Sequence, residues 1–308
     1  MPTMPGQEHE HELEHEGDVL VRGPSAGFPR GLTRISVLDG RNGIDFAILR
    51  LGRGERHTGD SGGAGQLGLE RGWLLLGGEV VLHAADLPPQ LVRRTSLFDE
   101  EPVVAHVPAG MPLAVEAATD AELALLAVRN EQYFVPQLLG GAGGILESEL
   151  RGRGRLDDTA YRIVRTIFDL RNRPESRLVL GEVVAFPGRW SSYPPHHHPQ
   201  PEIYHYRFSE PQGYGHAEAG EAVFKVRRGD TLLIPSGADH AQAAAPGYGM
   251  YYLWAIRHLP DRPYTVPEFS AEHRWLNEPE PAVWRAQLYP PPGGSSPEQA
   301  AAASERRR

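Results

Sequence analysis

Two stretches in the second half of the chain decide the fold: GRWSSYPPHHHPQPEIYHYRF at residues 188–208 and RRGDTLLIPSGADHAQAAA at residues 227–245. The first stretch contains His196 and His198, which are two residues apart. Side chains alternate between the two faces of an extended segment, so these two imidazoles point to one face and His197 points to the other. Two imidazoles on one face of a strand supply part of a ligand set for a metal ion.

A carboxylate and a third imidazole complete the pattern. Glu202 follows the sequence PQP, whose prolines indicate that one strand ends and another begins at the carboxylate. His240 comes after the turn at 228–230, the apolar strand at 231–234 and a second turn at 235–237. Three imidazoles and one carboxylate on separate strands that a barrel brings together are typical ligands of a divalent transition metal. We therefore predict a metal site formed by His196, His198, Glu202 and His240.

The two halves of the pattern occur in a fixed order. The first half runs from Gly188 through HxH to Glu202, and the second runs from Gly229 through PxG to His240. A histidine run by itself is usually a solvated loop, and Pro-x-Gly by itself is only a turn. The conjunction of the two resembles the paired signature of the cupin superfamily. Seven residues separate Gly188 from His196, where the superfamily usually has five.

The composition indicates the fold class and argues against several kinds of protein. The chain has 308 residues, with 35 glycines, 28 prolines and short apolar runs, which indicates an all-β protein of two domains. It has no cysteine, which suits a cytoplasmic location. The net charge is −9 and no basic stripe is visible, which argues against a nucleic-acid partner. No apolar run has the length of a membrane span, and no apolar export signal begins the chain, so we expect neither membrane insertion nor export.

An internal comparison predicts two similar barrels. The sequence VPAGMPL at 107–113 has the shape of IPSGADH at 234–240, but Leu113 stands where the second copy has His240. We therefore predict two tandem cupin barrels of the double-stranded β-helix or jelly-roll type, of which only the second binds metal. The predicted organisation is a disordered tail rich in histidine and glutamate at 1–17, a barrel without metal ligands at 18–130, a linker at 131–176, the metal-binding barrel at 177–289 and a disordered tail at 290–308.

The resemblance is closer than superfamily level. The strings GRWSSYPPHHH, EIYHYRF, GDTLLIPSGADH and APGYGMYYL, together with VPAGMPLAVEAATDAELALLAV in the first half, resemble the 5-deoxy-glucuronate isomerases of bacterial myo-inositol catabolism. The resemblance implies a bicupin that interconverts 5-deoxy-D-glucuronate and 2-deoxy-5-keto-D-gluconate. It also implies a zinc ion on the four predicted ligands, with Mn²⁺ and Fe²⁺ as alternatives because their ligand preferences overlap. A small uronic acid would be the partner, and a homo-oligomer is possible.

Two departures from the isomerase pattern keep other functions open. The chain has Tyr-His-Tyr-Arg at 204–207 where that family usually has Tyr-Tyr-His-Arg, and its PQP link before Glu202 is short. The 5-keto-4-deoxyuronate isomerases of pectin breakdown are similar in architecture, and they tend to carry an aromatic residue at the exchanged position. A cupin dioxygenase would use the same ligands with iron. A sugar-binding cupin would use the barrel without turnover.

The predicted chemistry needs an acid, a base and a group that binds the substrate carboxylate. Strand parity places Tyr204 and Tyr206 on the same face as Glu202, so either phenol, or a hydroxide held by the metal, is a candidate for the base. A metal-assisted hydride shift is equally compatible with the sequence. Arg189 and Arg207 are candidates for binding the carboxylate, and the parity of Arg207 counts against it.

Overall fold

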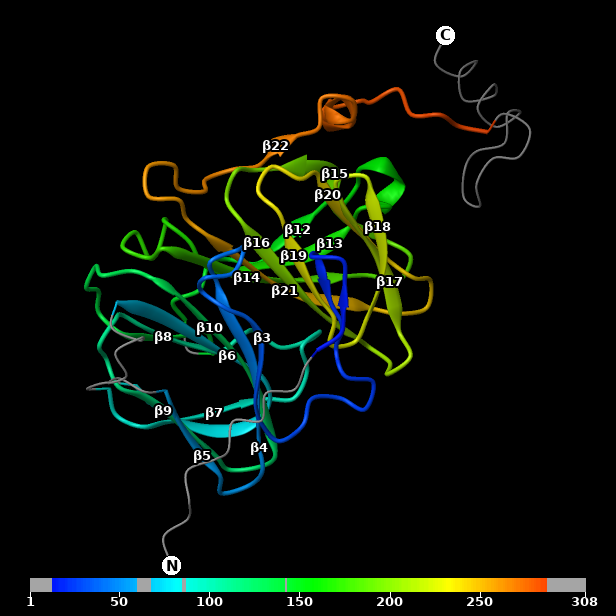
Figure 1. Ribbon diagram of the computed structural model, residues 1–308. Coiled ribbons are helices and arrows are strands. Elements are labelled where there is room, and N and C mark those ends of the chain that lie inside the picture. Colours follow the sequence, from blue (N-terminus) through cyan, green and yellow to red (C-terminus); the bar gives the residue numbers. More distant parts are fainter. Residues whose placement is uncertain (1–12, 60–67, 85–86, 142, 287–308) are drawn as a thin grey trace, which may run out of the picture. The chain divides into compact units, whose positions relative to one another are not determined.

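Strands are the main regular elements of the described chain, and its helices are short 3-10 helices (Figure 1). This computed structural model describes residues 13–59, 68–84, 87–141 and 143–286. The predicted tail at 290–308 and most of the predicted tail at 1–17 lie outside the described residues. The chain divides into two units, 1–270 and 271–308, and the described part of the second contains the 3-10 helix η2 (Arg274–Asn277). Among the residues described, none of the helices is long and apolar enough to cross a membrane.

The elements of the first unit follow in this order: β1 (His15–Glu16), β2 (Leu20–Val21), β3 (Gly31–Ser36), β4 (Asp45–Leu51), β5 (Arg56–Gly59), β6 (Leu69–Ala84), β7 (Gln90–Arg94), β8 (Val104–Val107), β9 (Leu113–Ala117), β10 (Ala121–Arg129), β11 (Gln137–Leu139), β12 (Glu149–Arg151), the 3-10 helix η1 (Leu156–Asp158), β13 (Arg162–Phe168), β14 (Leu178–Ala185), β15 (Trp190–His197), β16 (Glu202–Phe208), β17 (Tyr214–Ala219), β18 (Ala222–Arg227), β19 (Thr231–Ile234), β20 (His240–Ala244), β21 (Met250–Arg257) and β22 (Glu268–Phe269).

Two barrels are built from these strands, which confirms the predicted all-β fold of tandem cupin barrels. In the first barrel a sheet with the order β11-β8-β6-β10-β4-β3 continues through the long strand β6 into β7 and β9, and β9 pairs with β5. In the second barrel an eight-stranded sheet with the order β1-β2-β19-β16-β21-β14-β13-β12 stands against a five-stranded sheet with the order β18-β17-β20-β15-β22. Figure 1 shows the first barrel in blue and cyan and the second mainly in green, yellow and orange.

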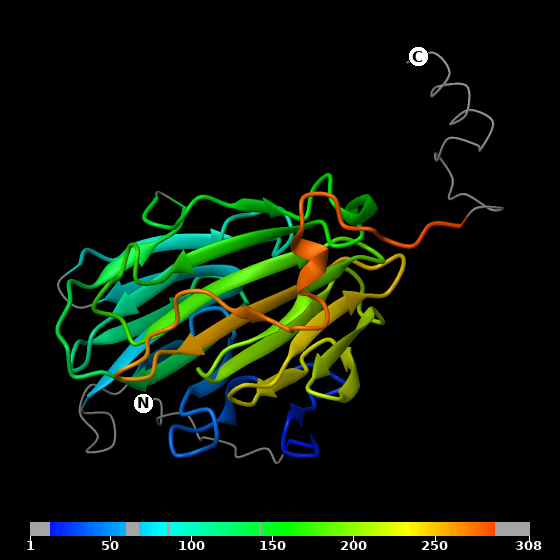
Figure 2. The ribbon, with the colours of Figure 1, turned by 90° about the horizontal axis from the view of Figure 1, so that it is seen from above.

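Three apolar cores follow from the alternation of side chains along the strands. In β10, Leu123 and Leu125 fill the lumen of the first barrel, while Ala124 and Leu126 pack between the barrels. In β16, Tyr204 fills the lumen of the second barrel while its neighbour Ile203 packs between the barrels. Figure 2 shows the long strands of the two facing sheets running in nearly the same direction, as in aligned sheet packing. The two barrels therefore share one core as well as having one each.

Strand pairing crosses the predicted domain boundaries at two places. His15 and Glu16, in the range predicted to be a disordered tail, form β1 and pair with β2 across a turn that contains Gly17 at φ 62°. β2 then pairs with β19, so the start of the chain extends the sheet of the second barrel. The predicted linker at 131–176 contributes β12 and β13 to the same sheet. Short segments gain backbone partners and buried apolar contacts by joining an existing sheet edge.

Candidate metal centre

Both sheets of the second barrel contribute to the centre. β15 and β20 are neighbours in the five-stranded sheet, and their register places His196 directly opposite His240. Glu202 begins β16 in the facing eight-stranded sheet, and the chain reaches it through the short link that follows His198. The barrel therefore brings donors from three strands and one link to one end of its lumen.

A bulge in β15 explains the long spacing between Gly188 and the first histidine. Ser191 of β15 pairs with Gln242 of β20, and the next paired residues are His196 and His240. Between these two pairs β15 therefore contains more residues than β20. The extra residues of β15 are accommodated as an irregular stretch in which Ser192 has φ 54°. The departure from the usual spacing therefore leaves the alignment of His196 with His240 intact.

Three of the four predicted ligands lie together. Donor atoms of His198, Glu202 and His240 are all within 4.8 Å of one another, and all three side chains are buried. The Oε2 atom of Glu202 lies 3.1 Å from Nε2 of His198 and 3.3 Å from Nε2 of His240. His196 stands beside this group, and its ring is 4.5 Å from that of His240 in an edge-on arrangement.

Backbone carbonyls orient all three imidazoles. The Nδ1 atoms of His196, His198 and His240 lie 3.4, 2.9 and 3.0 Å from the carbonyl oxygens of Pro194, Gln200 and Ala238, respectively. A carbonyl only accepts a hydrogen bond, so each Nδ1 carries the proton and each Nε2 presents a lone pair. This backbone orientation of the distal nitrogen is typical of histidines that bind metals.

Burial keeps His196 and His240 neutral. Burial, followed by the neighbouring His198, lowers the pKa of His196 to about 4. Burial, followed by the neighbouring His196, lowers the pKa of His240 to about 3. Neutral imidazoles are the form that binds a metal ion at neutral pH.

The donor chemistry fits a cation. With Nδ1 protonated, Nε2 of His198 and Nε2 of His240 both direct lone pairs toward the carboxylate of Glu202, and acceptors facing acceptors repel unless a positive charge lies between them. Nε2 of His240 is fully buried and has no hydrogen-bond partner within the described chain, although Glu202 is only 3.3 Å away. An unpaired buried acceptor of this kind costs free energy unless a ligand satisfies it. The group of His198, Glu202 and His240 can therefore bind a metal ion.

Tyrosines line the lumen next to this group. Tyr204 places its ring 5.7 Å from that of His240, and its hydroxyl lies 3.3 Å from Oγ of Ser192. The hydroxyl of Tyr252 lies 2.5 Å from Oγ of Ser191 and 3.4 Å from Oγ of Ser192. Burial raises the pKa of both phenols, and the charge of Glu202 raises that of Tyr204 further. Both tyrosines therefore keep their protons at neutral pH.

Two buried polar side chains lack partners in the same lumen. Gln242 is two residues from His240 on β20 and therefore shares its face, and neither amide atom of Gln242 has a hydrogen-bond partner among the described residues. The hydroxyl of Tyr206 is also fully buried and unpartnered there. Buried polar atoms that the protein leaves unpaired are suited to a ligand with several hydroxyl groups. The sequence pattern alone did not single out Gln242.

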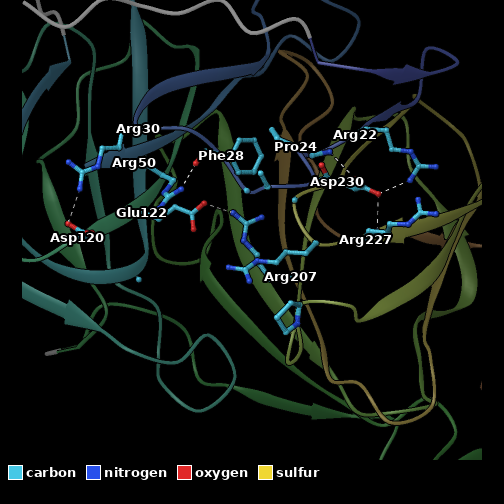
Figure 3. Close-up of a pocket in the computed structure, with 18 of the residues that line it drawn as sticks. Arg22, Pro24, Phe28, Arg30, Arg50, Asp120, Glu122, Arg207, Arg227 and Asp230 are labelled. Carbon is cyan, nitrogen blue, oxygen red and sulfur yellow. Dashed lines mark hydrogen bonds and ion pairs between the residues drawn. The ribbon is translucent and has the colours of Figure 1, made fainter. Parts of the chain in front are cut away.

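The structure does not bring Arg189 or Arg207 into this group. Arg189 lies in the turn before β15, and its Nη1 atom donates to the carbonyl of Asp157 at 3.3 Å. Arg207 points away from the lumen, as its parity predicts, and binds Glu122 of the first barrel at 2.8 Å. It lines a cavity of about 870 Å³ between the barrels, where Figure 3 shows it directed toward Glu122. The predicted site residues that lie close together are therefore the histidines, Glu202 and the tyrosines on the luminal face of the second barrel.

Two curled β-barrels in tandem, with a histidine and glutamate group at one end of the second lumen, define a two-domain cupin that can bind a metal ion in its C-terminal barrel. The chain belongs to the KduI/IolB family, whose model matches residues 32–276. This match confirms the family resemblance that the sequence motifs indicate.

Curated relatives and a solved structure agree with this family. The chain is 28% identical over 202 residues to a 5-deoxy-glucuronate isomerase of Geobacillus kaustophilus, which covers 58% of this chain and 70% of the relative. It is 28% identical over 226 residues to the same-named protein of Lacticaseibacillus casei, which covers 67% of this chain and 79% of the relative. The crystal structure of an IolB-like protein from Salmonella typhimurium LT2 superposes with a TM-score of 0.70 at 23% identity, over 84% of this chain and 99% of that one.

Proposed function

We propose that this protein is a metal-dependent isomerase that interconverts 5-deoxy-D-glucuronate and 2-deoxy-5-keto-D-gluconate. The single observation that carries this proposal is the convergence of His198, Glu202 and His240 in a buried, tyrosine-lined lumen of a chain of this family. The names of the curated relatives support the choice of substrate.

The proposed ligands of the metal are His196, His198, Glu202 and His240, and Zn²⁺ is the proposed ion. The ring of His196 stands against that of His240, and its Nδ1 faces a carbonyl, so its Nε2 is available as the fourth donor. When bound, a divalent cation acts as a Lewis acid that polarises the substrate carbonyl and lowers the pKa of an adjacent hydroxyl group. Glu202 supplies the only negative charge among these ligands, which leaves a net positive site that favours an anionic substrate.

The reaction moves a hydrogen from C2 of the aldose to C1, and a proton from the C2 hydroxyl oxygen to the C1 oxygen. We propose that the phenol of Tyr204 exchanges a proton with these atoms, because its ring stands against His240 and its hydroxyl remains in reach of Ser192. Ser191 and Ser192 hold the neighbouring Tyr252 in place through its hydroxyl. Tyr206, deeper in the lumen, offers a free hydroxyl to the substrate.

Turnover under defined metal and oxygen conditions tests the proposal. Purified protein is loaded with Zn²⁺, Mn²⁺ or Fe²⁺ and assayed without oxygen on 5-deoxy-D-glucuronate and, in parallel, on 5-keto-4-deoxyuronate. We expect turnover of the first substrate, loss of activity after chelation, and recovery when the ion is returned. Activity that survives complete removal of metal contradicts the metal-dependent mechanism.

The same experiment separates the other functions of this fold. A preference for 5-keto-4-deoxyuronate assigns the protein to pectin breakdown. A requirement for oxygen indicates a dioxygenase. Saturable binding without product by the loaded protein contradicts an isomerase. The cytoplasmic location and the homo-oligomer stay predictions, which fractionation and light scattering would test.

A further inference from the structure

A buried arginine on β13 faces the lumen of the second barrel. The register of β13 and β14 places Arg162 opposite Ala185 and Val164 opposite Val183. Ala185, Val164 and Val183 all belong to the luminal core of the second barrel. Residues that are direct partners, or two positions apart, share one face of a sheet, so the side chain of Arg162 stands on the luminal face.

This guanidinium lacks the acidic partner that a buried charge normally has. Arg162 is buried, and Nη1 donates to the carbonyl of Ala160 at 2.8 Å. No ion pair joins Arg162 to a carboxylate among the described residues, and its side-chain hydrogen bond goes to a backbone carbonyl. The nearby Glu149 forms its ion pair with Arg151 instead, at 2.8 Å. Arginine keeps its proton even when buried, so a positive charge without a carboxylate stands in the lumen.

The other buried arginines of the described chain are of two kinds. Arg71 and Arg173, like Arg162, donate to backbone carbonyls and have no carboxylate partner in that part of the chain. Arg94 and Arg165, which are also buried, both bind the carboxylate of Glu182, at 2.7 and 2.9 Å. A buried charge without a partner costs several kcal/mol, so it persists where a ligand supplies the partner. Arg162 differs in its place, because it stands on the luminal face of the barrel that holds the proposed metal ligands, where an anion could supply its partner.

The charge of Arg162 reaches the groups around the metal ligands. Burial lowers the pKa of Arg162, and the nearby phenols of Tyr252 and Tyr204 oppose this lowering. Burial raises the pKa of Tyr252, and the charge of Arg162 opposes that rise. The guanidinium is therefore electrostatically coupled to two luminal phenols that lie beside the proposed ligands.

We propose that Arg162 binds the carboxylate of the substrate and so positions the other end of a six-carbon uronic acid at the metal ligands. This inference rests on the proposed function, because it assumes that a uronic acid enters the lumen. The carboxylate of such an acid is at C6, and the reacting carbons are C1 and C2. Five carbon–carbon bonds span about 6 Å, which is enough to reach across part of a small barrel. The planar guanidinium of Arg162 can donate two parallel hydrogen bonds, which match the two oxygens of one carboxylate.

The simplest alternative is that Arg162 has only a structural role, through its hydrogen bond to the carbonyl of Ala160. Arg189 offers a matched comparison, because its Nη1 also donates to a backbone carbonyl, that of Asp157, but it lies outside the lumen. Substitutions at the two arginines remove the same kind of backbone contact. Only the substitution at Arg162 removes a luminal charge.

Binding of an acid and of its neutral amide tests the proposal directly. The zinc-loaded wild-type protein and the variants R162Q, R162K and R189Q are titrated with D-glucuronate and D-glucuronamide by calorimetry. We expect the wild type and R189Q to bind the acid about 10- to 100-fold more tightly than the amide, since a hydrogen bond to a charged group is worth that much. R162Q should bind both about equally, and R162K should fall between because an ammonium is a point charge.

Kinetics on 5-deoxy-D-glucuronate supply a second readout. R162Q should raise KM by about 10- to 100-fold with a smaller change in kcat, at unchanged zinc content and unchanged unfolding midpoint. The proposal is overturned if R162Q keeps the preference for the acid, if it weakens acid and amide equally, or if the wild type shows no such preference. If R162Q loses the preference while the wild type turns over neither uronate, Arg162 binds carboxylates and the proposed isomerase function is wrong.

Discussion

Glu182, on the second barrel, binds Arg94, on the first, through two hydrogen bonds of 2.7 and 3.0 Å, and both side chains are fully buried. The same carboxylate accepts hydrogen bonds from Arg165 and from the hydroxyl of Tyr251, each at 2.9 Å. The carboxylate is therefore fully satisfied inside the apolar core that the barrels share. This network joins the two barrels by charge as well as by packing.

Removal of this charge should destabilise the whole first unit. E182Q leaves Arg94 and Arg165 buried without a negative partner, and breaking a buried pair in this way costs about 3–5 kcal/mol. We expect a loss of that size in the free energy of unfolding, measured by urea denaturation. E149Q is the matched control, because Glu149 and Arg151 form a solvent-exposed pair that contributes at most about 1 kcal/mol. Equal losses in the two variants would contradict the role of Glu182.

Loss of the proposed ligand His240, on β20, should remove bound zinc, whereas loss of His197, on β15, should not. H240Q should reduce bound zinc to trace levels and lower kcat/KM by at least about 100-fold, because it removes a buried donor that faces Glu202. Metal analysis and steady-state kinetics check this result. H197Q is the control, since His197 lies next to two proposed ligands but binds Asp239 at 2.6 Å. A zinc content that H240Q leaves unchanged would rule out the proposed site.

Added zinc should also stabilise the folded protein. Ligand that binds only the native state stabilises it by about 4 kcal/mol at a free concentration 1,000 times its Kd. We expect the unfolding midpoint of the wild type to rise with zinc, and that of H240Q to stay nearly constant. A chelator should reverse the rise in the wild type. A similar rise in both proteins would place the bound ion elsewhere.

Loss of the Tyr204 hydroxyl should affect turnover and leave metal binding intact. Y204F removes the phenol that we propose to exchange a proton with the substrate, and such groups contribute about 10²- to 10⁴-fold to the rate. We expect kcat to fall by that factor with unchanged zinc content. Y214F, on the strand β17 away from the ligands, is the control. Full activity in Y204F would leave Tyr206 or solvent as the acid and base.

Acid should destabilise the interface between the barrels through His205. Burial, and then the charge of Arg207, hold the pKa of His205 well below its ordinary value of 6.5. The unfolded chain takes up a proton near pH 6.5 that the folded protein does not. The free energy of unfolding is therefore highest above pH 6.5, and this histidine lowers it by about 1.4 kcal/mol for each pH unit below that value.

Denaturation at several pH values tests this dependence. H205Q should reduce the slope of the unfolding free energy against pH, between pH 6 and 5, by about 1.4 kcal/mol per unit. H216Q, at an exposed position on β17, should retain the wild-type slope. An identical slope in the wild type and H205Q would show that His205 takes up its proton equally in both states.

The strand pattern of the second barrel could be predicted from the sequence, because the face to which a side chain points follows from its position within its own strand. The alternation from Glu202 to Phe208 predicts that Tyr204 and Tyr206 face the lumen and that Arg207 faces away, and the structure shows this arrangement. The all-β fold of two barrels follows from the same kind of pattern and is confirmed. The roles of the site residues stay proposals.

The long-range pairing could not be read from local patterns. Arg162 lies within the range predicted to be a linker, and its luminal position depends on its register with β14. A signal was present, because RIVRTIF and LGEVVA place Arg162, Arg165 and Glu182 within otherwise apolar segments. Charges inside an apolar strand either pair with one another or face a ligand. Which of these applies depends on contacts across the sheet.

The hairpin formed by β1 and β2 has a consequence for how the protein is made. Arg22, just after β2, pairs with Asp230, which is 208 positions away in the chain. At translation rates of about 5–20 residues per second, the first strands wait on the order of 10–40 s before their partner β19 leaves the ribosome. During that interval their backbone is available to other sheet edges, so the barrel that carries the proposed metal ligands cannot close before β19 has been made.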